Sequence, residues 1–294
     1  MILVTGATGN AGSEVVRALR ERGARVRAFV RDREKARQKL GDEVELALGG
    51  FEDRESVRAA LDGVEAALLS CVDDPRRVEW EKSAIDAAVM GGVRRIARLS
   101  TIGAEPGAPV AFWDWHGQID EHLRAAGVAG VVLQSSFYMS NLLAAAEPVS
   151  REGRIYAPAG SAKVAMIDPR DVGSAAAAVL TGADEEAETH VLTGPEAIGY
   201  DQVASELSAA TGREVVFVDV PDDGARQAMV GAGLPDFVAE QLVKIFGMLR
   251  QGVAETVTDT VESLTGAKPR TFAAFARDHA RLFQPAGTEA GAER

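Results

Sequence analysis

The sequence predicts an α/β fold with a doubly wound parallel sheet and a smaller C-terminal α/β region. The apolar run Ile2–Val4 is followed by three glycines at three-residue spacing and then by a helical pattern, an order typical of the first turn of such a sheet. Strand-like and helix-like segments alternate over roughly the first 150 residues, which predicts parallel strands joined by helices. Beyond Pro148 the pattern changes to short strands around Pro/Gly turns, which indicates a second unit.

Length and charge bound the class of protein. The chain has 294 residues, which suits two unequal domains. We expect a larger domain over 1–150 with returns from about 163–195, a smaller region over 151–283 and a disordered tail over 284–294. The net charge of -12 argues against binding nucleic acid through a basic face. The sequence has no 18-residue apolar run and no leader pattern, so we expect a cytoplasmic protein without membrane contact.

The cysteine and histidine content argues against metal binding. The single cysteine, Cys71, excludes a disulfide framework and a cysteine metal cluster. The four histidines show no metal-ligand spacing. Cys71 itself either lines a ligand site at a strand end or is a small buried hydrophobic residue.

The stretch Gly6–Gly12 has the features of a dinucleotide-binding turn. Glycine is needed there because the turn is tight and because the backbone must approach a pyrophosphate closely. The N–H groups that open the following helix, expected over Ser13–Arg22, would face the phosphate with the helix dipole behind them. An ordinary glycine-rich turn is the alternative. The candidate pyrophosphate-binding residues are Gly6, Thr8, Gly9, Asn10, Ala11 and Gly12.

The residue that follows the second strand, expected over Arg25–Val30, indicates which dinucleotide binds. An acidic residue there would bond the ribose of NAD(H), whereas this chain has Arg31, with Lys35 nearby. Cations at this position suit a 2′-phosphate, so the sequence favours NADP(H) over NAD(H). Asp32 is expected to cap the next helix through its carboxylate.

Polar residues stand at the carboxyl ends of the later strands of the sheet, where ligands bind in open α/β folds. The further elements of the first domain are expected to be strands 44–48, 64–70, 94–100 and 130–134 and helices 33–40, 55–61, 75–91 and 117–126. The strand 64–70 is nearly all apolar and is expected to be central. The cofactor-binding candidates at these loops and strand ends are Phe51, Ser70, Cys71, Ser100, Thr101, Ser136 and Phe137.

An aromatic segment follows the fifth strand. The Gly/Pro-rich loop 104–109 leads into Phe112–His116, which we expect to be a flexible approach to the site. Trp113 and Trp115 are candidates for stacking on an aromatic substrate, and ordinary packing is the alternative. Asn141 is a third substrate candidate.

The C-terminal part is expected to contain short strands and several helices. A helix that ends near Pro148 comes first, and the helix 172–181 is expected to be capped by Asp168 or Asp171. The other elements are expected to be strands 153–157, 163–167, 190–193 and 215–220 and helices 200–211, 223–252 with a break at 231–235, and 271–282.

Motifs spread along the chain resemble those of one family. The run Thr5–Gly12 (T-G-A-T-G-N-A-G) looks like the signature of the atypical short-chain dehydrogenases, and Val30–Asp32 (V-R-D) resembles their NADP-type strand ending. The segments His116–Gly127 and Ser136–Leu142, with later blocks up to about residue 282, are similar to the NmrA-like subgroup. The resemblance implies an NADP-binding Rossmann domain and a small C-terminal domain that closes over a substrate cleft.

The chain departs from the family pattern at the expected catalytic acid. Wider relatives use a Tyr-x-x-x-Lys pair, but none of the three tyrosines here has Lys four residues on. His116 stands where isoflavone-reductase-like relatives carry a catalytic Lys, and its ordinary pKa of about 6.5 suits proton donation. His116 is therefore the first catalytic candidate and Tyr138 the second; alternatively, His116 only starts a helix and lines the cleft. Gly49-Gly50 replaces the usual Gly-Asp after the third strand, which removes an adenine-side carboxylate.

The residues and the resemblance lead to one expected activity and two alternatives. We expect NADPH-dependent reduction of a quinone-like or carbonyl-bearing aromatic small molecule by hydride transfer. A quinone tolerates the missing Tyr/Lys pair, because its reduced oxyanion is a phenolate and is far less basic than an alkoxide. The alternatives are a non-catalytic NADP(H)-binding redox sensor of the NmrA type and a biosynthetic ketoreductase or isomerase on the same fold. The expected partner is a small-molecule substrate, and the protein is expected to be a monomer or homodimer.

Overall fold

The computed structural model describes residues 1–182 and 187–285, so residues 286–294 of the predicted tail lie outside the described part. The chain divides into two compact units. Unit 1 comprises Met1–Ser136, Pro169–Thr193 and Thr258–Pro269, and unit 2 comprises Phe137–Asp168, Gly194–Val257 and the chain from Arg270 onward. The division after Ser136 differs from the predicted boundary at 150, because the chain leaves the sheet directly after its sixth strand.

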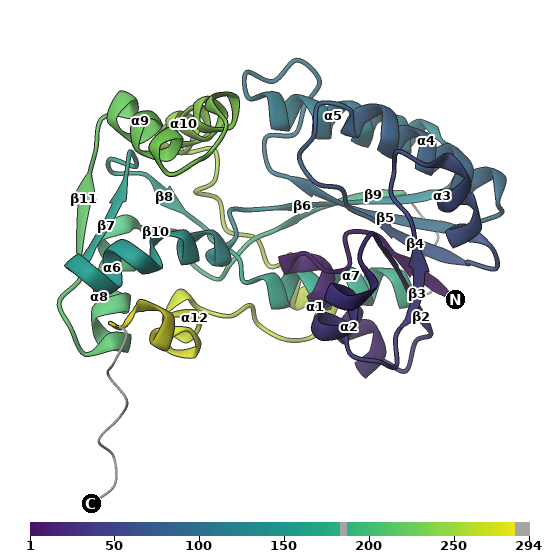
Figure 1. Ribbon diagram of the computed structural model, residues 1–294, viewed down its shortest axis with the longest axis horizontal. Helices are drawn as coiled ribbons and strands as arrows, with labels where there is room; N and C mark the ends of the chain where they lie inside the picture. The colour runs from purple at the N-terminus through teal and green to yellow at the C-terminus, as the bar shows by residue number, and fades with distance from the viewer. Residues whose placement is uncertain (183–186, 286–294) are drawn as a thin grey trace, which may run out of the picture. The chain divides into compact units, whose positions relative to one another are not determined.

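Unit 1 is built on a seven-stranded parallel sheet (Figure 1). Its strands lie in the order β3 (Glu45–Leu48), β2 (Val26–Val30), β1 (Ile2–Val4), β4 (Ala66–Leu69), β5 (Arg95–Thr101), β6 (Ala129–Ser135) and β9 (Glu188–Leu192). The connections change direction between β1 and β4, which makes the sheet doubly wound and places its switch point there. The middle strand β4 is buried along its whole length. The predicted fold class and the central place of this strand are therefore confirmed.

Helices cover both faces of the sheet (Figure 1). The helices α1 (Asn10–Glu21), α2 (Arg33–Leu40) and α7 (Pro169–Thr181) lie on one face, and α3 (Arg54–Leu61), α4 (Arg77–Met90) and α5 (Ala111–Ala125) lie on the other. The short helix α11 (Thr260–Thr265) packs on α7 and β9. Under α3, α4 and α5, apolar side chains such as Leu69, Ile85, Ile96 and Ile119 form one continuous core. Both faces are covered, so the strands carry apolar residues on both sides.

Several predicted helices begin or end elsewhere. The helix α5 begins at Ala111 rather than at 117, so the aromatic segment predicted to be a flexible approach is helical. The helix predicted to end near Pro148 continues, because α6 (Ala146–Glu152) has Pro148 in its first turn, where no backbone N–H is needed. For the same reason α7 begins at Pro169, three residues before its predicted start.

Unit 2 combines two small sheets with several helices. β7 (Arg154–Ala157) pairs in parallel with β11 (Val216–Asp219), and β8 (Lys163–Val164) pairs antiparallel with β10 (Ile198–Gly199). The ring of Tyr200 lies 5.4 Å from that of Phe217 and 6.1 Å from that of Phe246, which packs three elements together. The helices of this unit are η1 (Met139–Ala145), α6, α8 (Tyr200–Thr211), α9 (Asp222–Gly231), α10 (Asp236–Arg250), α12 (Phe272–Asp278) and η2 (Ala280–Phe283).

The packing of α1 on α7 in unit 1 depends on Gly173. A Cβ atom at this position would lie 2.6 Å from the backbone carbonyl carbon of Glu14, which is closer than carbon atoms approach without bonding. The two helices therefore touch backbone to backbone. This contact fixes how α1 lies on the sheet, and therefore where its amino end is placed.

We predict that Gly173→Ala lowers the free energy of unfolding by about 1–3 kcal/mol, because α7 must move away from α1 to admit a methyl group. Urea denaturation followed by circular dichroism measures the change. Gly231→Ala is the matched control, because a Cβ there meets no atom within 4 Å, and we expect it to leave stability unchanged or slightly raised. Equal stability of the Gly173→Ala variant and the wild type would show that the helices are not tightly packed.

Candidate functional site

The glycine turn, defined as Gly6–Gly12, joins β1 to α1 at the switch point of the sheet. Gly6 has a φ of +59°, in the left-handed region, and a Cβ there would lie 2.9 Å from the carbonyl oxygen of Ser70. A Cβ at Gly12 would overlap the carbonyl oxygen of Gly6. Both positions therefore require glycine, and the backbone of the turn is left without side chains that would block a ligand.

The amino end of α1 has the properties of an anion-binding site. The helix begins at Asn10 rather than at Ser13, so Gly12 belongs to its first turn. Its N-cap residue is Gly9, no side chain caps it, and its first turn holds no acidic residue. Thr8, Gly9 and Asn10 are exposed, whereas Ala11 and Gly12 are buried against the sheet. A phosphate group at this helix end would be stabilised by the N–H groups and the helix dipole, so the residues present fit a dinucleotide.

Thr5 holds the glycine turn against the end of β4. Its hydroxyl accepts a hydrogen bond from the backbone N–H of Ser70 at 2.8 Å. The same oxygen lies 3.0 Å from the carbonyl of Ser70 and 3.2 Å from that of Leu68, within donating distance of both. The sequence motif contains Thr5, but only the structure shows that it ties the turn to the neighbouring strand.

The loop after β2 places one cation where a 2′-phosphate is expected. Arg31 is exposed and, among the described residues, it forms neither an ion pair nor a side-chain hydrogen bond. Lys35 is 81 % exposed and lies 4.0 Å from Asp32. The carboxylate of Asp32 accepts a hydrogen bond from the backbone N–H of Lys35 at 3.1 Å, which confirms the predicted cap. Arg31 is therefore the better placed of the two cations for binding a ligand.

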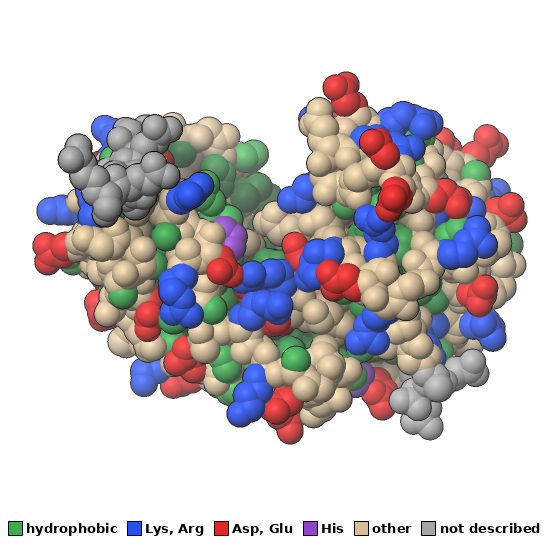
Figure 2. Space-filling model, turned by 90° about the horizontal axis from the view of Figure 1, so that it is seen from below, with side chains coloured by type: hydrophobic (Ala, Val, Ile, Leu, Met, Phe, Trp, Pro, Cys, Tyr) green, Lys and Arg blue, Asp and Glu red, His purple; other side chains and the backbone are tan. Residues whose placement is uncertain are grey.

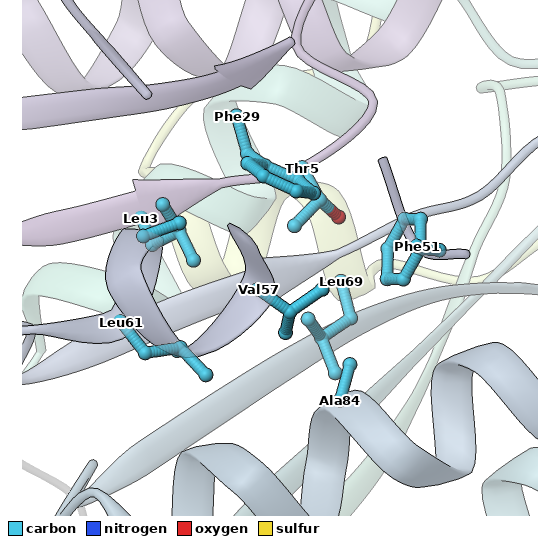
Figure 3. Close-up of a pocket in the computed structure, with 9 residues that line it drawn as sticks. Leu3, Thr5, Phe29, Phe51, Val57, Leu61, Leu69 and Ala84 are labelled. Atoms are coloured by element: carbon cyan, nitrogen blue, oxygen red, sulfur yellow. The ribbon is translucent and has the colours of Figure 1, made fainter. Parts of the chain in front are cut away.

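Phe51 is part of the core as well as of the loop after β3. Its ring meets the ring of Phe29 edge-on, with the centroids 6.1 Å apart. Figure 3 shows both rings at a small cavity whose lining is apolar apart from Thr5. The cavity is lined by Leu3, Thr5, Phe29, Phe51, Val57, Ala60, Leu61, Leu69 and Ala84. A role of Phe51 in cofactor binding stays a prediction.

The predicted strand-end residues meet at the carboxyl edge of the sheet. Ser70 and Cys71 follow β4 directly, and Thr101 of β5 pairs in register with Ser135 of β6. The hydroxyl groups of Ser135 and Ser136 are buried and have no hydrogen-bond partner among the described residues. Buried hydroxyls without partners are costly, and a ligand with amide or hydroxyl groups would satisfy them. Phe137, the next residue, begins unit 2.

Cys71 is not a reactive thiol. Burial is the main cause that raises its pKa to about 12, and the negative charge of Glu81 adds to the shift. A thiol with this pKa stays protonated at neutral pH and is a poor nucleophile. The alternative that Cys71 is a small, largely inert side chain at the strand end therefore has physical support.

A group of four buried charged residues, which the sequence analysis missed, lies between β5 and the helices α4 and α5. We call Arg77, Glu81, Arg98 and Asp120 the buried ion group. Glu81 lies 2.8 Å from the Arg77 guanidinium and 3.0 Å from that of Arg98, and Arg98 also bonds Asp120. The exposed fractions of these four side chains do not exceed 2 %. Arg98 stands between the apolar residues Ala97 and Leu99 of the strand, and a buried charge requires a buried partner, so this signal was available.

The buried ion group holds two positive and two negative charges, and these charges act on the pKa values of its carboxylates. Burial by itself would raise the pKa of Glu81, but the guanidinium groups of Arg98 and Arg77 outweigh it and lower that pKa. Burial dominates at Asp120 and raises its pKa against the opposing charge of Arg98. The second carboxylate oxygen of Asp120 accepts a hydrogen bond from Ser100 at 2.6 Å. The buried ion group is thereby connected to a predicted cofactor-binding residue.

His116 is attached to the same group. Its Nδ1 lies 3.1 Å from a terminal nitrogen of Arg98. Burial, followed by the positive charges of Arg77 and Arg98, lowers the pKa of His116 well below its ordinary value of 6.5. The expectation that His116 donates a proton with a pKa near 6.5 is corrected, because a histidine in this environment is uncharged at neutral pH.

The two predicted substrate tryptophans have different surroundings. Trp113 is buried, and its ring occupies the space where Gly103 would carry a Cβ, so packing is what the structure shows for it. Trp115 is half-buried, and its ring meets that of Phe112 at 5.4 Å. Trp115 therefore stays the better candidate for contact with a ligand.

Tyr138 and Asn141 belong to unit 2. Tyr138 forms a β-bridge with Ile167, and its carbonyl oxygen accepts a hydrogen bond from the N–H of Asn141 at 3.0 Å. Asn141 is exposed in the first turn of η1. Their predicted roles in catalysis and substrate binding stay predictions.

Charged side chains of both signs are scattered over the face of the molecule that Figure 2 shows.

Within residues 1–182 and 187–285, histidine, cysteine and carboxylate side chains form no cluster of three or more able to hold a metal ion. None of the helices in these ranges combines the length and the apolar character that crossing a bilayer requires.

Comparison with known proteins assigns the chain to a family. The model of the NmrA-like family matches residues 1–276, and the chain belongs to this family. An NAD(P)H azoreductase of Xenophilus azovorans is 37 % identical over 96 % of this chain and 99 % of the relative. A (4-alkanoyl-5-oxo-2,5-dihydrofuran-3-yl)methyl phosphate reductase of Streptomyces griseus is 36 % identical over 97 % of this chain and its own full length. An NADPH-dependent quinone oxidoreductase of Escherichia coli, solved with NADPH, is 28 % identical, with a TM-score of 0.86 over 95 % of this chain and 99 % of that structure.

We predict that Cys71 reacts with a disulfide reagent such as DTNB on the order of a thousandfold more slowly at pH 8 than a free thiol, because its raised pKa leaves little thiolate. Absorbance at the wavelength of the released aromatic thiolate follows the reaction. The same sample in denaturant is the control and should react at once. Labelling of the folded protein at the rate of a free thiol would contradict the raised pKa.

Proposed function

We propose that this protein is an NADPH-dependent oxidoreductase that reduces quinone-like, conjugated small molecules by hydride transfer. The observation that carries the proposal is the glycine turn in front of the uncapped amino end of α1, at the switch point of a parallel sheet. Relatives named as NAD(P)H-dependent reductases, among them an azoreductase and a quinone oxidoreductase, support the same class of reaction.

The site residues would hold the cofactor through separate groups. Backbone N–H groups of the glycine turn bind the pyrophosphate, and Arg31 pairs with the 2′-phosphate. The hydroxyls of Ser135 and Ser136, buried and without partners among the described residues, suit the amide of the nicotinamide. Bound NADPH supplies the hydride. The cofactor would then lie along the carboxyl edge of the sheet.

The absence of a proton-donating side chain indicates which class of hydride acceptor the site suits. Neither the Tyr-x-x-x-Lys pair nor a histidine at position 116 that is charged at neutral pH is available. A ketone needs a proton donor, because its reduced oxygen is a strongly basic alkoxide. A quinone becomes a phenolate-type anion, which a hydrogen bond can stabilise sufficiently. Quinones and similarly conjugated acceptors are therefore the substrates that this site suits best.

We predict that the purified protein oxidises NADPH in the presence of substituted benzoquinones and naphthoquinones. Stopped-flow or steady-state absorbance of NADPH measures the rate, and parallel reactions with aromatic ketones and azo dyes compare the acceptor classes. Binding of NADPH without turnover of any acceptor would overturn the enzymatic proposal and favour a redox sensor. Turnover of ketones alone would favour a tailoring ketoreductase.

We predict that Arg31→Ala weakens NADPH binding by about 10- to 100-fold, because one charged hydrogen-bonding partner of the 2′-phosphate is lost. NADH lacks this phosphate, so its binding should stay the same. Fluorescence titration of both cofactors measures the change. Arg33→Ala is the matched control, since Arg33 is also an exposed cation, two residues further on. Equal weakening by both variants would show that only general charge matters.

A further inference from the structure

We propose that Arg98 is a positioning residue that holds His116 as a neutral imidazole with its hydrogen on Nε2, so that His116 donates a hydrogen bond, not a proton, to the oxygen that is reduced. The proposal rests on the proposed reductase function. It assigns a role to the buried ion group. It also narrows the substrate class to acceptors whose reduced oxygen is weakly basic.

The geometry between the side chains of Arg98 and His116 indicates the tautomer of the imidazole. A terminal nitrogen of Arg98 lies 3.1 Å from Nδ1 of His116. A guanidinium has only donors and does not lose its proton in proteins. Nδ1 must therefore accept this hydrogen bond, and the single hydrogen of a neutral imidazole must be on Nε2. Within the described residues, no hydrogen bond engages that Nε2–H, which leaves it available to a substrate.

Buried ion pairs hold the side chain of Arg98 in place. Its side chain is fully buried, and it bonds Glu81 from α4 and Asp120 from α5. A second contact places the carbonyl oxygen of His116 3.5 Å from the same guanidinium. Arg98 is thus held from two helices while it contacts both the ring and the backbone of His116. The ring orientation is set by a group that cannot move without breaking buried ion pairs.

Charged groups from several elements surround His116. Arg98 faces it from β5, Arg77 with Glu81 faces it from α4, and Asp120 lies one turn further along α5. Asp114 on the same helix bonds Gln118 and the N–H of Gly107. Glu105, in the loop that packs on α5, is exposed. The strand β6 contributes no titratable side chain. Burial of the ring is the main cause that disfavours a positive charge on His116, and the charges of Arg77 and Arg98 add to it.

The chemistry follows from a donor that does not ionise. A quinone accepts a hydride, which is two electrons and one proton, from NADPH and becomes a hydroquinone monoanion, while the cofactor becomes NADP⁺. The Nε2–H of His116 stabilises the negative oxygen as it develops. The second proton comes from water. A protonated histidine is not needed at any stage, so the wild-type rate should not depend on pH over the range in which His116 stays neutral.

The direct test is the tautomer of His116 in the wild-type protein. Long-range proton–nitrogen NMR spectra of ¹⁵N-histidine-labelled protein distinguish the two tautomers and the charged form, and His116→Gln identifies the signal. His279 is an internal reference, because its Nδ1 lies 2.9 Å from the carbonyl oxygen of Phe275 and must donate. We expect an Nε2–H form of His116 that does not titrate between about pH 5 and 8. An Nδ1–H form or a charged ring in this range would overturn the proposal.

The positioning role is tested by Arg98→Gln. The amide can still donate to Nδ1, but the positive charge is gone, so we expect the pKa of His116 to rise and, at the pH where the ring becomes charged, quinone reduction to become pH-dependent. Arg95→Gln is the matched control: Arg95 lies on the same strand and instead bonds the carbonyl oxygens of Val179 and Gly182. An Arg98→Gln variant with an unchanged His116 spectrum would overturn the role of Arg98. If this variant does not fold, the wild-type spectra still decide the tautomer.

The catalytic role is tested by two substitutions of His116. His116→Leu removes the donor and should lower kcat for quinones by about 100-fold. His116→Gln keeps an N–H donor that cannot ionise and should retain most of the rate, with the same flat pH profile. Equal losses in both variants would overturn hydrogen-bond donation. Absence of turnover in the wild type would instead contradict the proposed function, while the NMR result would stand on its own.

Discussion

The ion pair between Arg98 and Glu81 is the constraint on which one face of unit 1 depends. An arginine cannot discharge itself by losing a proton, so its place in β5 requires carboxylates from α4 and α5. Loss of one partner from such a pair costs about 3–5 kcal/mol, whereas apolar residues of equal volume can be as stable. The ion pairs of Arg98 therefore matter mainly for geometry, because they set how α4 and α5 lie on β5.

A second constraint acts at the neighbouring strand ends. The contact of Gly12 with the carbonyl of Gly6 and the hydrogen bonds of Thr5 hold the turn against Ser70. The bond from Ser100 to Asp120 connects the next strand end to the buried ion group. Both constraints thus act at the carboxyl edge of adjacent strands. A cofactor bound by the turn and an acceptor beside His116 would depend on the same edge.

Much of the fold could be predicted because its signals are local. The apolar strands, the glycine turn and the cap at Asp32 depend on neighbouring residues, and the structure confirms them. The prediction of a flexible aromatic segment was wrong. The Gly/Pro residues indicated a loop, but this loop ends before Ala111, where α5 begins. The burial of Trp113 against Gly103 is a contact across this loop, and no local sequence pattern shows such a contact.

The sequence by itself determined the class of fold, the glycine turn and the cation after β2, because each depends on residue types at fixed short spacing. Only the tertiary structure decided the state of His116. Its lowered pKa depends first on burial, and then on Arg77 in another helix and on Arg98, 18 residues earlier. Burial and charge act through space, so the pKa of a histidine that the sequence suggests as a proton donor is lowered once the strand and helices pack.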